Sequence, residues 1–246
     1  MTLEISSKEV KQIKQNLEHI HANMKQAADK AGRGASDIKL VAVTKLMPLE
    51  TIMAGIEAGI RIFGENYPEQ AAEKITALDF REDIKWHMIG HIQSRKTTTV
   101  CEHFNMVHSL DRLKIARHLD KDCRELKKIM PTLIEVNISG EDSKYGWPAW
   151  DDKQWPKLVD TLKKIVEFKN LKINGLMTMP PYFEDPEKTR PYYQLLKRLQ
   201  DYLISEMPGV NWDELSIGTS FDYEVAIEEG ATIIRLGTEI FGPRPI

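Results

Sequence analysis

The chain has 246 residues, of which 41% are hydrophobic and 29% are charged, and its formal net charge is -3. This composition is typical of a globular protein, and the absence of Lys/Arg-rich blocks argues against nucleic acid as a partner. The N-terminus lacks the apolar segment of a signal peptide, and no apolar run is long enough to span a membrane. The two cysteines, Cys101 and Cys123, form no metal or redox motif. These features predict a cytoplasmic protein with reduced thiols.

Short apolar runs alternate along the chain with longer segments of helical periodicity. The apolar runs predict eight strands, at 38–44, 61–64, 84–89, 105–108, 132–138, 172–177, 215–217 and 232–236. Helices are predicted between them, at 48–58, 69–78, 112–128, 153–168 and 188–206. Strands that alternate with helices pair in parallel, so eight of them predict a closed (β/α)₈ TIM-type barrel, an α/β fold. We expect residues 1–246 to form one such domain.

Two features depart from an ideal barrel. A polar helix predicted at 7–31 precedes the first strand, and only GTEIFGPRPI follows the eighth, which leaves a truncated last helix. The leading helix is a candidate to cover the resulting gap. The structural alternative is a doubly wound open sheet. Its dinucleotide fingerprint is missing, because KLMP rather than a glycine-rich turn follows the first strand.

The first strand ends in a lysine that has two interpretations. LVAV (40–43) predicts a strand buried on both faces, and Lys45 follows two residues later. Lysines at strand ends commonly reach into solvent. A lysine that is partly shielded from water can instead lose its proton and attack a carbonyl. The second interpretation gains support because barrel enzymes place their chemistry at the carboxyl ends of the strands.

The last two strands are followed by small and hydroxyl-bearing residues. SIGTS (216–220) leads from the seventh strand into a helical segment, which puts Thr219 and Ser220 beside a helix N-terminus. Gly237 and Thr238 follow the eighth strand. Either feature alone is explained by capping or by a turn. Together they favour a phosphate site, because barrels frequently bind phosphate with these two loops.

Arg235 ends the eighth strand and is predicted by alternation to point into the barrel mouth. It could form a structural ion pair with a glutamate, or it could act as a fixed cation that donates to a ring nitrogen or carboxylate. With Lys45 and the phosphate site, it suggests a phosphorylated aldehyde as the ligand. Pyridoxal 5′-phosphate (PLP) has the aldehyde, the phosphate and the pyridine nitrogen that this set requires.

Seven motifs, in order along the chain, resemble the YggS family of pyridoxal phosphate homeostasis proteins. They are VAVTK (41–45), FGENYPEQ (63–70), WHMIGHIQSRK (86–96), EVNISGEDSKYGW (135–147), GLMTMPP (175–181), LSIGTSFDYEVAIEEG (215–230) and IIRLGTEIFGPR (233–244). That family is similar to the barrel domain of alanine racemase and carries PLP on the lysine of the first strand. The resemblance implies that Lys45 is the Schiff-base residue, which holds PLP as an internal aldimine.

The resemblance also implies which other residues surround the cofactor. Arg235 would lie near the pyridine nitrogen, and Asn66 and Met177 near the cofactor. The phosphate would be held by Ser220, Gly237 and Thr238, with Ser216 and Thr219 as further candidates for its pocket.

The chain departs from the family pattern at three places. The family usually has a non-histidine where His91 stands, Asn where Arg95 stands, and SMGMS in place of SIGTS. Lys144, in EDSKYGW, is the rival lysine, although its polar surroundings favour a solvated side chain. The pair His87 and His91 suggests a metal, but no carboxylate or cysteine stands at a helpful spacing, so no metal site is expected.

Three functional classes compete. The resemblance implies a PLP-binding protein of intracellular PLP homeostasis, which affects amino-acid metabolism indirectly and has PLP-dependent apo-enzymes as recipients; we expect a monomer. The second class is a PLP-dependent amino-acid racemase, and the third is a class I aldolase-like barrel that uses Lys45 with a sugar phosphate. In the racemases that this chain resembles, a tyrosine of an additional β domain supplies the second acid–base group. The chain ends ten residues after Leu236, so we expect little racemisation.

Overall fold

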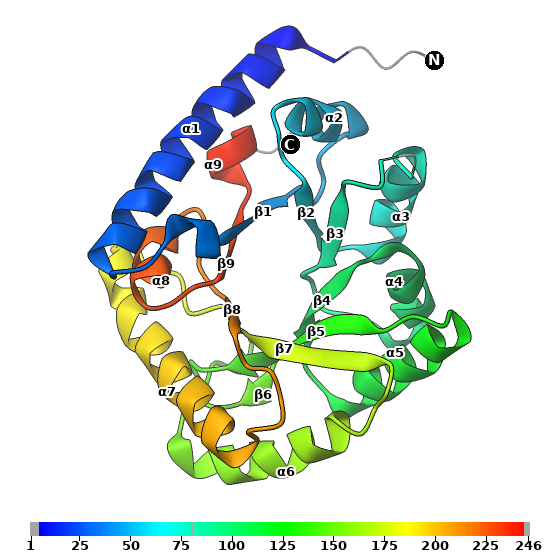
Figure 1. The fold of residues 1–246 in the computed structure, drawn as a ribbon, viewed down its shortest axis with the longest axis vertical. Coiled ribbons are helices and arrows are strands. Elements are labelled where there is room, and N and C mark those ends of the chain that lie inside the picture. The colour runs from blue at the N-terminus through cyan, green and yellow to red at the C-terminus, as the bar shows by residue number, and fades with distance from the viewer. Residues whose placement is uncertain (1–4, 80, 244–246) are drawn as a thin grey trace.

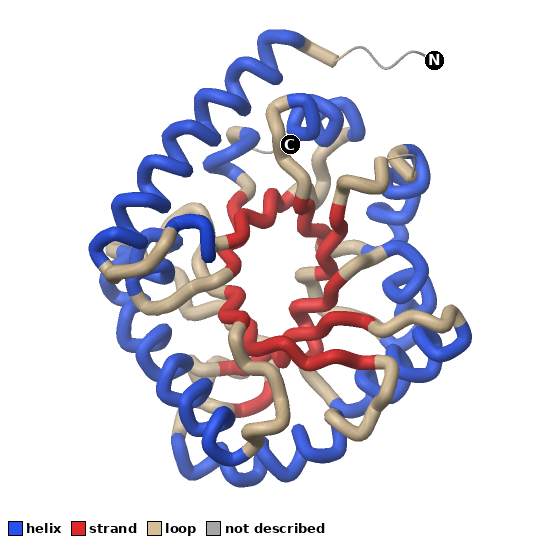
Figure 2. The backbone as a smooth tube through the Cα atoms, viewed as in Figure 1, coloured by secondary structure: helices blue, strands red, loops and turns tan. Residues whose placement is uncertain are grey.

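Eight parallel strands form a closed ring that is surrounded by helices (Figure 2). The computed structural model describes residues 5–79 and 81–243. The ring runs β1-β2-β3-β4-β5-β7-β8-β9 and closes where β9 pairs with β1, with Lys39 opposite Ile233 and Ala42 opposite Leu236. The predicted (β/α)₈ barrel is therefore confirmed. The predicted domain 1–246 includes residues 1–4, 80 and 244–246, which lie outside the described residues.

The barrel strands coincide with the eight predicted apolar runs to within about two residues. They are β1 (Lys39–Val43), β2 (Ile62–Glu65), β3 (Lys85–Met88), β4 (Met106–Leu110), β5 (Met130–Asn137), β7 (Leu171–Met177), β8 (Glu214–Ser216) and β9 (Ile233–Leu236). An additional two-residue strand, β6 (Trp147–Pro148), pairs with Val136 and Asn137 of β5 and takes no part in closing the ring. Because every pair is parallel, the carboxyl ends of the strands meet at one end of the barrel.

The helices lie outside the ring (Figures 1 and 2). Those at predicted positions are α2 (Leu49–Glu57), α3 (Pro68–Ala77), α5 (Leu113–Glu125), α6 (Trp155–Ile165) and α7 (Arg190–Glu206). Two short helices, α8 (Tyr223–Glu228) and α9 (Thr238–Phe241), follow the last two strands. Single 3₁₀ turns occupy η1 (Ala35–Asp37), η2 (Ser94–Lys96), η3 (Asp152–Gln154) and η4 (Pro186–Thr189).

Helix α4 (Thr97–His103) was not predicted. It begins with three threonines, which are β-branched and have low helix propensity. Tertiary contacts compensate, because Val100 and Cys101 are fully buried and the hydroxyl of Thr97 donates to the Asp122 carboxylate at 2.7 Å. Packing against α5 therefore outweighs the local preference of the sequence.

Helix α1 (Ser7–Lys30) completes the outer layer where the last helix is short. Its apolar residues recur every three or four positions, at Ile13, Leu17, Ile20 and Met24, and all are buried. This face packs against α2, α8 and α9, as Figure 1 shows along one side of the barrel. The leading helix thus covers the truncated last helix, as the sequence suggested.

The interior of the barrel changes from apolar to polar along the strands. An apolar cluster fills the interior, formed by Val41, Met106, Leu133, Met177 and Ile233. Two residues further along β4, β5 and β9, the same inward face carries His108, Glu135 and Arg235, which are also buried. Polar groups therefore lie between the apolar cluster and the carboxyl ends of the strands.

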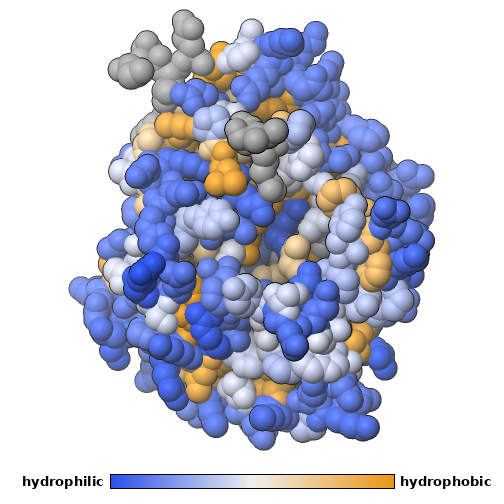
Figure 3. All heavy atoms as spheres, turned by 180° about the vertical axis from the view of Figure 1, so that it is seen from behind, coloured by the Kyte–Doolittle hydropathy of each residue, from blue (hydrophilic) through white to orange (hydrophobic). Residues whose placement is uncertain are grey.

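The outer surface is mainly hydrophilic on the face shown in Figure 3, where hydrophobic residues form separate areas. None of the described helices is long and apolar enough to cross a membrane. Several exposed large hydrophobic side chains lie in loops that follow the strands, among them Leu46, Tyr145, Met179, Tyr182 and Phe221. These loops border the carboxyl end of the barrel.

Candidate functional site

A cavity of about 360 Å³ lies at the carboxyl ends of the strands. This volume is within the range of small-molecule sites. Seven of the nine residues that were predicted to surround a cofactor line it, namely Lys45, Asn66, Thr219, Ser220, Arg235, Gly237 and Thr238. The barrel thus brings together residues that are far apart in the sequence.

The turn that follows β1 carries Lys45 into this cavity. Inward-facing positions alternate along β1, from Val41 in the apolar cluster to Val43 and Lys45 at the cavity wall. The amide of Met47 donates to the carbonyl of Thr44 at 3.0 Å, which closes a tight turn. Leu46 has φ of 64°, a left-handed conformation that costs energy for a side chain with a Cβ. The fold holds this strained turn at the position of Lys45.

A buried network beneath the turn anchors it. The ammonium of Lys74 donates to the Thr44 carbonyl at 3.2 Å and to the Glu65 carboxylate at 2.9 Å. The hydroxyl of Thr44 donates to the same carboxylate at 2.8 Å. Glu65 and Thr44 are fully buried, so this ion pair depends on its complete set of hydrogen bonds. The residue before Lys45 is therefore fixed through both its backbone and its side chain.

Asn66 presents an unsatisfied acceptor at the cavity. Its Oδ1 is buried and has no hydrogen-bond partner among the described residues. Gly90 packs so closely that a Cβ there would lie 2.6 Å from the Asn66 carbonyl oxygen, which explains the glycine after β3. A buried acceptor without a partner calls for an explanation, and a ligand in the cavity supplies one.

The loops after β8 and β9 converge on the hydroxyl of Ser220. The amides of Gly237 and Glu239 both lie 3.4 Å from Ser220 Oγ. Gly218 bends the first loop with φ of 89°, and a Cβ there would lie 2.7 Å from the Cβ of Ala226. This is the arrangement of small and hydroxyl residues from which the sequence predicted a phosphate site.

Thr219 is held by the carboxylate of Asp222. Both its amide, at 2.7 Å, and its hydroxyl, at 3.0 Å, donate to Asp222 Oδ1. The phenol of Tyr193 donates to the other oxygen of this buried carboxylate. Burial, together with the nearby charge of Asp222, raises the pKa of Tyr193 well above its ordinary value, so the phenol stays protonated. Thr219 thus shapes the loop while also lining the cavity.

Arg235 lies at the inner end of the cavity and is 5% exposed. Its guanidinium donates to Ser216 Oγ at 2.5 Å, to the Thr178 carbonyl at 3.1 Å and to the sulfur of Met179 at 2.8 Å. Within residues 5–79 and 81–243, no carboxylate oxygen lies within 4.0 Å of its nitrogens. Burial lowers the pKa of this guanidinium from its very high ordinary value. The structural ion pair that the sequence left open is therefore not formed.

Two predicted site residues do not line the cavity. Met177 belongs to the apolar cluster inside the barrel. Ser216 is fully buried, and its hydroxyl oxygen accepts a hydrogen bond from the guanidinium of Arg235. The resemblance implies Ser216 as a candidate for the phosphate pocket, and this stays a prediction; in the structure its hydroxyl bonds to Arg235 and His108.

The rival lysine also reaches the cavity. Lys144 lines it and donates to the carbonyl of Pro180 at 3.2 Å. The segment 179–183, which follows β7, forms another part of the wall. No functional signal marks this segment in the sequence, apart from the family motif that covers residues 179–181, because its residues are neither charged nor hydroxyl-bearing except Tyr182.

His87 and His91, the pair that suggested a metal site in the sequence, contact different partners. His87 Nδ1 lies 2.9 Å from His108 Nε2 inside the barrel. His91 Nδ1 lies 2.8 Å from the carboxylate of Asp111, and its ring stacks on Tyr145 at 3.8 Å between centroids. Among the described residues there is no group of three or more His, Cys, Asp and Glu side chains that could hold a metal ion.

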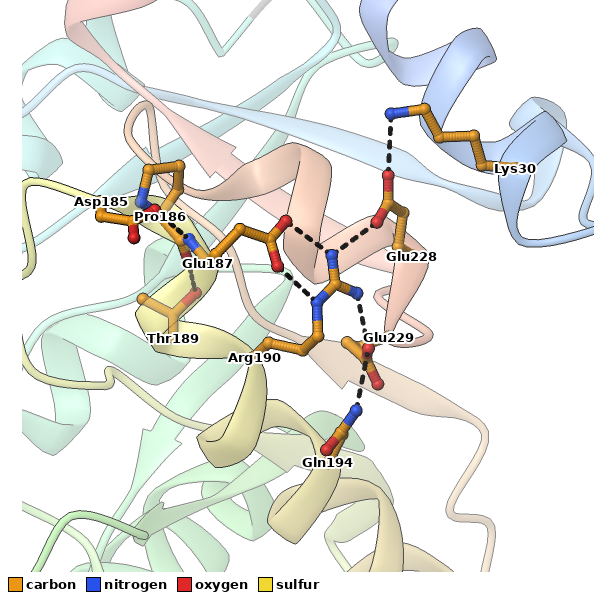
Figure 4. Close-up of polar contacts among 9 residues, drawn as sticks. All are labelled: Lys30, Asp185, Pro186, Glu187, Thr189, Arg190, Gln194, Glu228 and Glu229. Carbon is orange, nitrogen blue, oxygen red and sulfur yellow. Dashed lines mark hydrogen bonds and ion pairs between the residues drawn. The ribbon is translucent and has the colours of Figure 1, made fainter.

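Arg190, at the start of α7, ties the loop after β7 to α8 (Figure 4). Its guanidinium donates at 2.7 Å to the carboxylates of Glu187, Glu228 and Glu229. Lys30 of α1 adds a hydrogen bond of 3.1 Å to Glu228. These carboxylates raise the pKa of Arg190, with Glu187 contributing most. The loop that forms one side of the cavity is thereby fastened to the layer formed by α1 and α8.

The chain belongs to the class of the alanine racemase N-terminal domain. The model of that family matches residues 15–245. The alanine racemase of Streptomyces lavendulae shares the fold, with a TM-score of 0.68 and 16% identity over 96% of this chain and 58% of that chain.

Closer similarity identifies the family within this class. The pyridoxal phosphate homeostasis protein of Vibrio cholerae is 39% identical over 239 residues, which are 96% of this chain and 98% of that protein. The structure of PipY from Synechococcus elongatus with PLP bound has a TM-score of 0.81 and 29% identity, and covers 94% of this chain and 100% of that one. The chain belongs to the family of pyridoxal phosphate homeostasis proteins.

Proposed function

We propose that this protein binds PLP in the cavity at the carboxyl end of the barrel and acts in PLP homeostasis. One observation carries the proposal: a lysine, a pair of loops with a hydroxyl group and a buried arginine converge on one cavity. These features are represented by Lys45, Ser220 and Arg235 respectively. The family membership supports it, since PipY, which is 29% identical, has a structure with PLP bound.

The chemistry of the cavity residues fits this cofactor. Asn66 Oδ1, which has no partner in the part of the chain that the structure describes, can accept a hydrogen bond from a ligand. Arg235 retains donors because a guanidinium has five N–H groups. PLP supplies an aldehyde that reacts with amines and a pyridine ring that withdraws electrons. The cavity therefore offers an acceptor and donors of the kinds that such a molecule needs.

Residues from different walls of the cavity would each contact a different group of PLP. The amine of Lys45 would bind the aldehyde carbon as a Schiff base, with loss of water. The loops of Ser220, Gly237 and Thr238 would hold the phosphate, and Arg235 would donate to the ring nitrogen. Because arginine remains protonated at physiological pH, that nitrogen would stay unprotonated.

The test is a visible absorption spectrum of the protein with added PLP, before and after borohydride reduction. Reduction should remove the Schiff-base band and fix a pyridoxyl group on the chain, and peptide mapping should locate it on Lys45. A sugar-phosphate Schiff base would not absorb in the visible range, so a visible band in the protein as purified separates the aldolase-like alternative. Absence of any band at saturating PLP would refute the proposal.

Replacing Ser220 with alanine is expected to weaken the binding of PLP more than the binding of pyridoxal, which has no phosphate. A hydrogen bond to a charged group contributes about 1.5–3 kcal/mol, or roughly ten- to a hundredfold in affinity. The Kd of each ligand, measured by fluorescence titration, checks this difference. Equal losses for both ligands would show that Ser220 does not contact the phosphate.

We further propose that the protein is a single cytoplasmic domain that acts as a monomer. We propose that it delivers PLP to PLP-dependent apo-enzymes and so affects amino-acid metabolism indirectly. A stoichiometric mixture of the loaded protein with such an apo-enzyme tests delivery. The recipient should gain activity faster than it does with the same concentration of free PLP added together with the Lys45→Ala variant. Equal rates would argue against direct delivery.

A further inference from the structure

We infer that Ser216, His108 and His87 form a hydrogen-bond chain of fixed direction that positions Arg235 at the inner end of the cavity. The chain lies inside the barrel and contains no carboxylate. Ser216 and His108 are thus positioning residues that act through Arg235. The inference rests on the proposed function, since the ring nitrogen of PLP is the group that Arg235 would meet.

Four buried side chains from four strands make the chain. Arg235 Nη1 donates to Ser216 Oγ at 2.5 Å, Ser216 Oγ lies 2.8 Å from His108 Nδ1, and His108 Nε2 lies 2.9 Å from His87 Nδ1. The exposed fractions are 0% for Ser216 and His108, 5% for Arg235 and 7% for His87. Water therefore does not replace these contacts, and each group depends on its neighbour in the chain.

The donors and acceptors that each group offers determine the direction of the hydrogen bonds along the chain. Arg235 can only donate, so the Ser216 oxygen must accept from it. Within the described part of the chain, His108 is the other hydrogen-bond partner of Ser216, and its Nδ1 is the acceptor available for the serine proton. His108 must then carry its proton on Nε2 and donate to His87 Nδ1, which leaves the His87 proton on Nε2. The reverse direction would leave the buried Ser216 hydroxyl proton without an acceptor.

Both histidines are neutral in this setting. Burial lowers the pKa of His87 to about 4. Burial, followed by the charges of His87 and Arg235, also lowers the pKa of His108 well below its ordinary value. A neutral chain orients the guanidinium without neutralising it, whereas a carboxylate partner would offset its charge. The chain itself therefore leaves the positive charge of Arg235 at the cavity, beside the proposed place of the ring nitrogen.

The first test measures the histidine tautomers directly. In protein labelled with ¹⁵N-histidine, NMR at pH 7 should find His108 and His87 neutral, with the proton on Nε2 in both. This readout needs no cofactor. A proton on Nδ1 of His108, or a charged imidazolium, would overturn the proposed direction.

The second test uses PLP labelled with ¹⁵N in the ring. In the loaded wild-type protein the ring nitrogen should give the shift of an unprotonated pyridine. Ser216→Ala should change that shift and weaken PLP binding about tenfold, because Arg235 loses one of its three acceptors. Ser216→Thr, which keeps the hydroxyl, should restore both. Thr132→Val is the matched control, because Thr132 is equally buried but, within the described residues, its hydroxyl bonds only to the nearby carbonyl of Met130.

The outcomes separate this inference from the proposed function. A wild-type protein that binds no PLP would overturn both. A Ser216→Ala protein that binds PLP with an unchanged ¹⁵N shift and affinity would overturn the inference alone. The same change in Thr132→Val as in Ser216→Ala would also overturn it, because the effect would then come from any lost buried hydroxyl.

Discussion

Replacing Lys45 with alanine is expected to abolish the Schiff-base band and the borohydride-stable label, whereas Lys144→Ala is expected to keep both. The two lysines line the same cavity, so proximity alone does not distinguish them. Lys45 lies in the strained turn at the end of β1, anchored through Thr44 by Lys74, while Lys144 comes from a loop and donates to a backbone carbonyl. The fixed turn makes Lys45 the better-placed nucleophile.

Spectra of the two variants at saturating PLP, followed by peptide mapping, check this expectation. Each variant removes one cavity lysine and retains the other, so each is the control for the other. A label that remains in Lys45→Ala and maps to Lys144 would reverse the assignment. Partial labelling of both lysines in the wild-type protein would show that the turn does not select between them.

Replacing Glu135 with glutamine is expected to stabilise the protein at alkaline pH and to have much less effect near pH 5. Burial, followed by the charge of Asp111, raises the pKa of Glu135 from 4.5 to about 8. The folded protein keeps this proton up to about pH 8, whereas the unfolded chain loses it near pH 4.5. The carboxyl therefore costs folding free energy that grows as pH rises through this window. A shift of this size corresponds to a few kcal/mol, at about 1.4 kcal/mol for each pKa unit.

Urea unfolding of the wild type and of Glu135→Gln at pH 5 and pH 8.5 measures the effect. The difference in unfolding free energy between the two proteins should increase toward the higher pH. Glu184→Gln is the matched control, because it removes the same charge from an exposed position. If the difference is the same at both pH values, Glu135 does not retain its proton in the folded protein.

The sequence predicted the barrel well because its strands carry a strong local signal. Parallel strands that are buried on both faces are continuous apolar runs, and each of the eight runs became a barrel strand. Helix α4 gave no such signal, since its threonines favour extended structure and its helical state depends on contacts with α5. The sequence pattern therefore predicted secondary structure correctly where the local preference of the residues and their tertiary packing agree.

The candidate site was predictable where residues follow strand ends. Lys45, Ser220 and Gly237 stand within four residues of the carboxyl ends of strands, and topology alone brings those ends together. The network of Lys74 and Glu65 was not predictable, because a lysine within a polar helix looks the same in sequence whether its ammonium is solvated or buried. The contact between Ser216 and Arg235 was not predictable either, because the sequence does not show which neighbour the serine hydroxyl bonds to.

Closure of the ring between β1 and β9 has a consequence for how the protein folds. These strands lie at opposite ends of the barrel sequence, so their pairing is a contact of very long range and cannot form before β9 has been synthesised. During synthesis Lys45 emerges long before Gly237, and the two walls of the cavity meet only after β9 has left the ribosome. A ligand that bridges them binds only the closed ring, and so shifts the last step of folding toward completion by mass action. Occupancy of the cavity would then report that the barrel has closed.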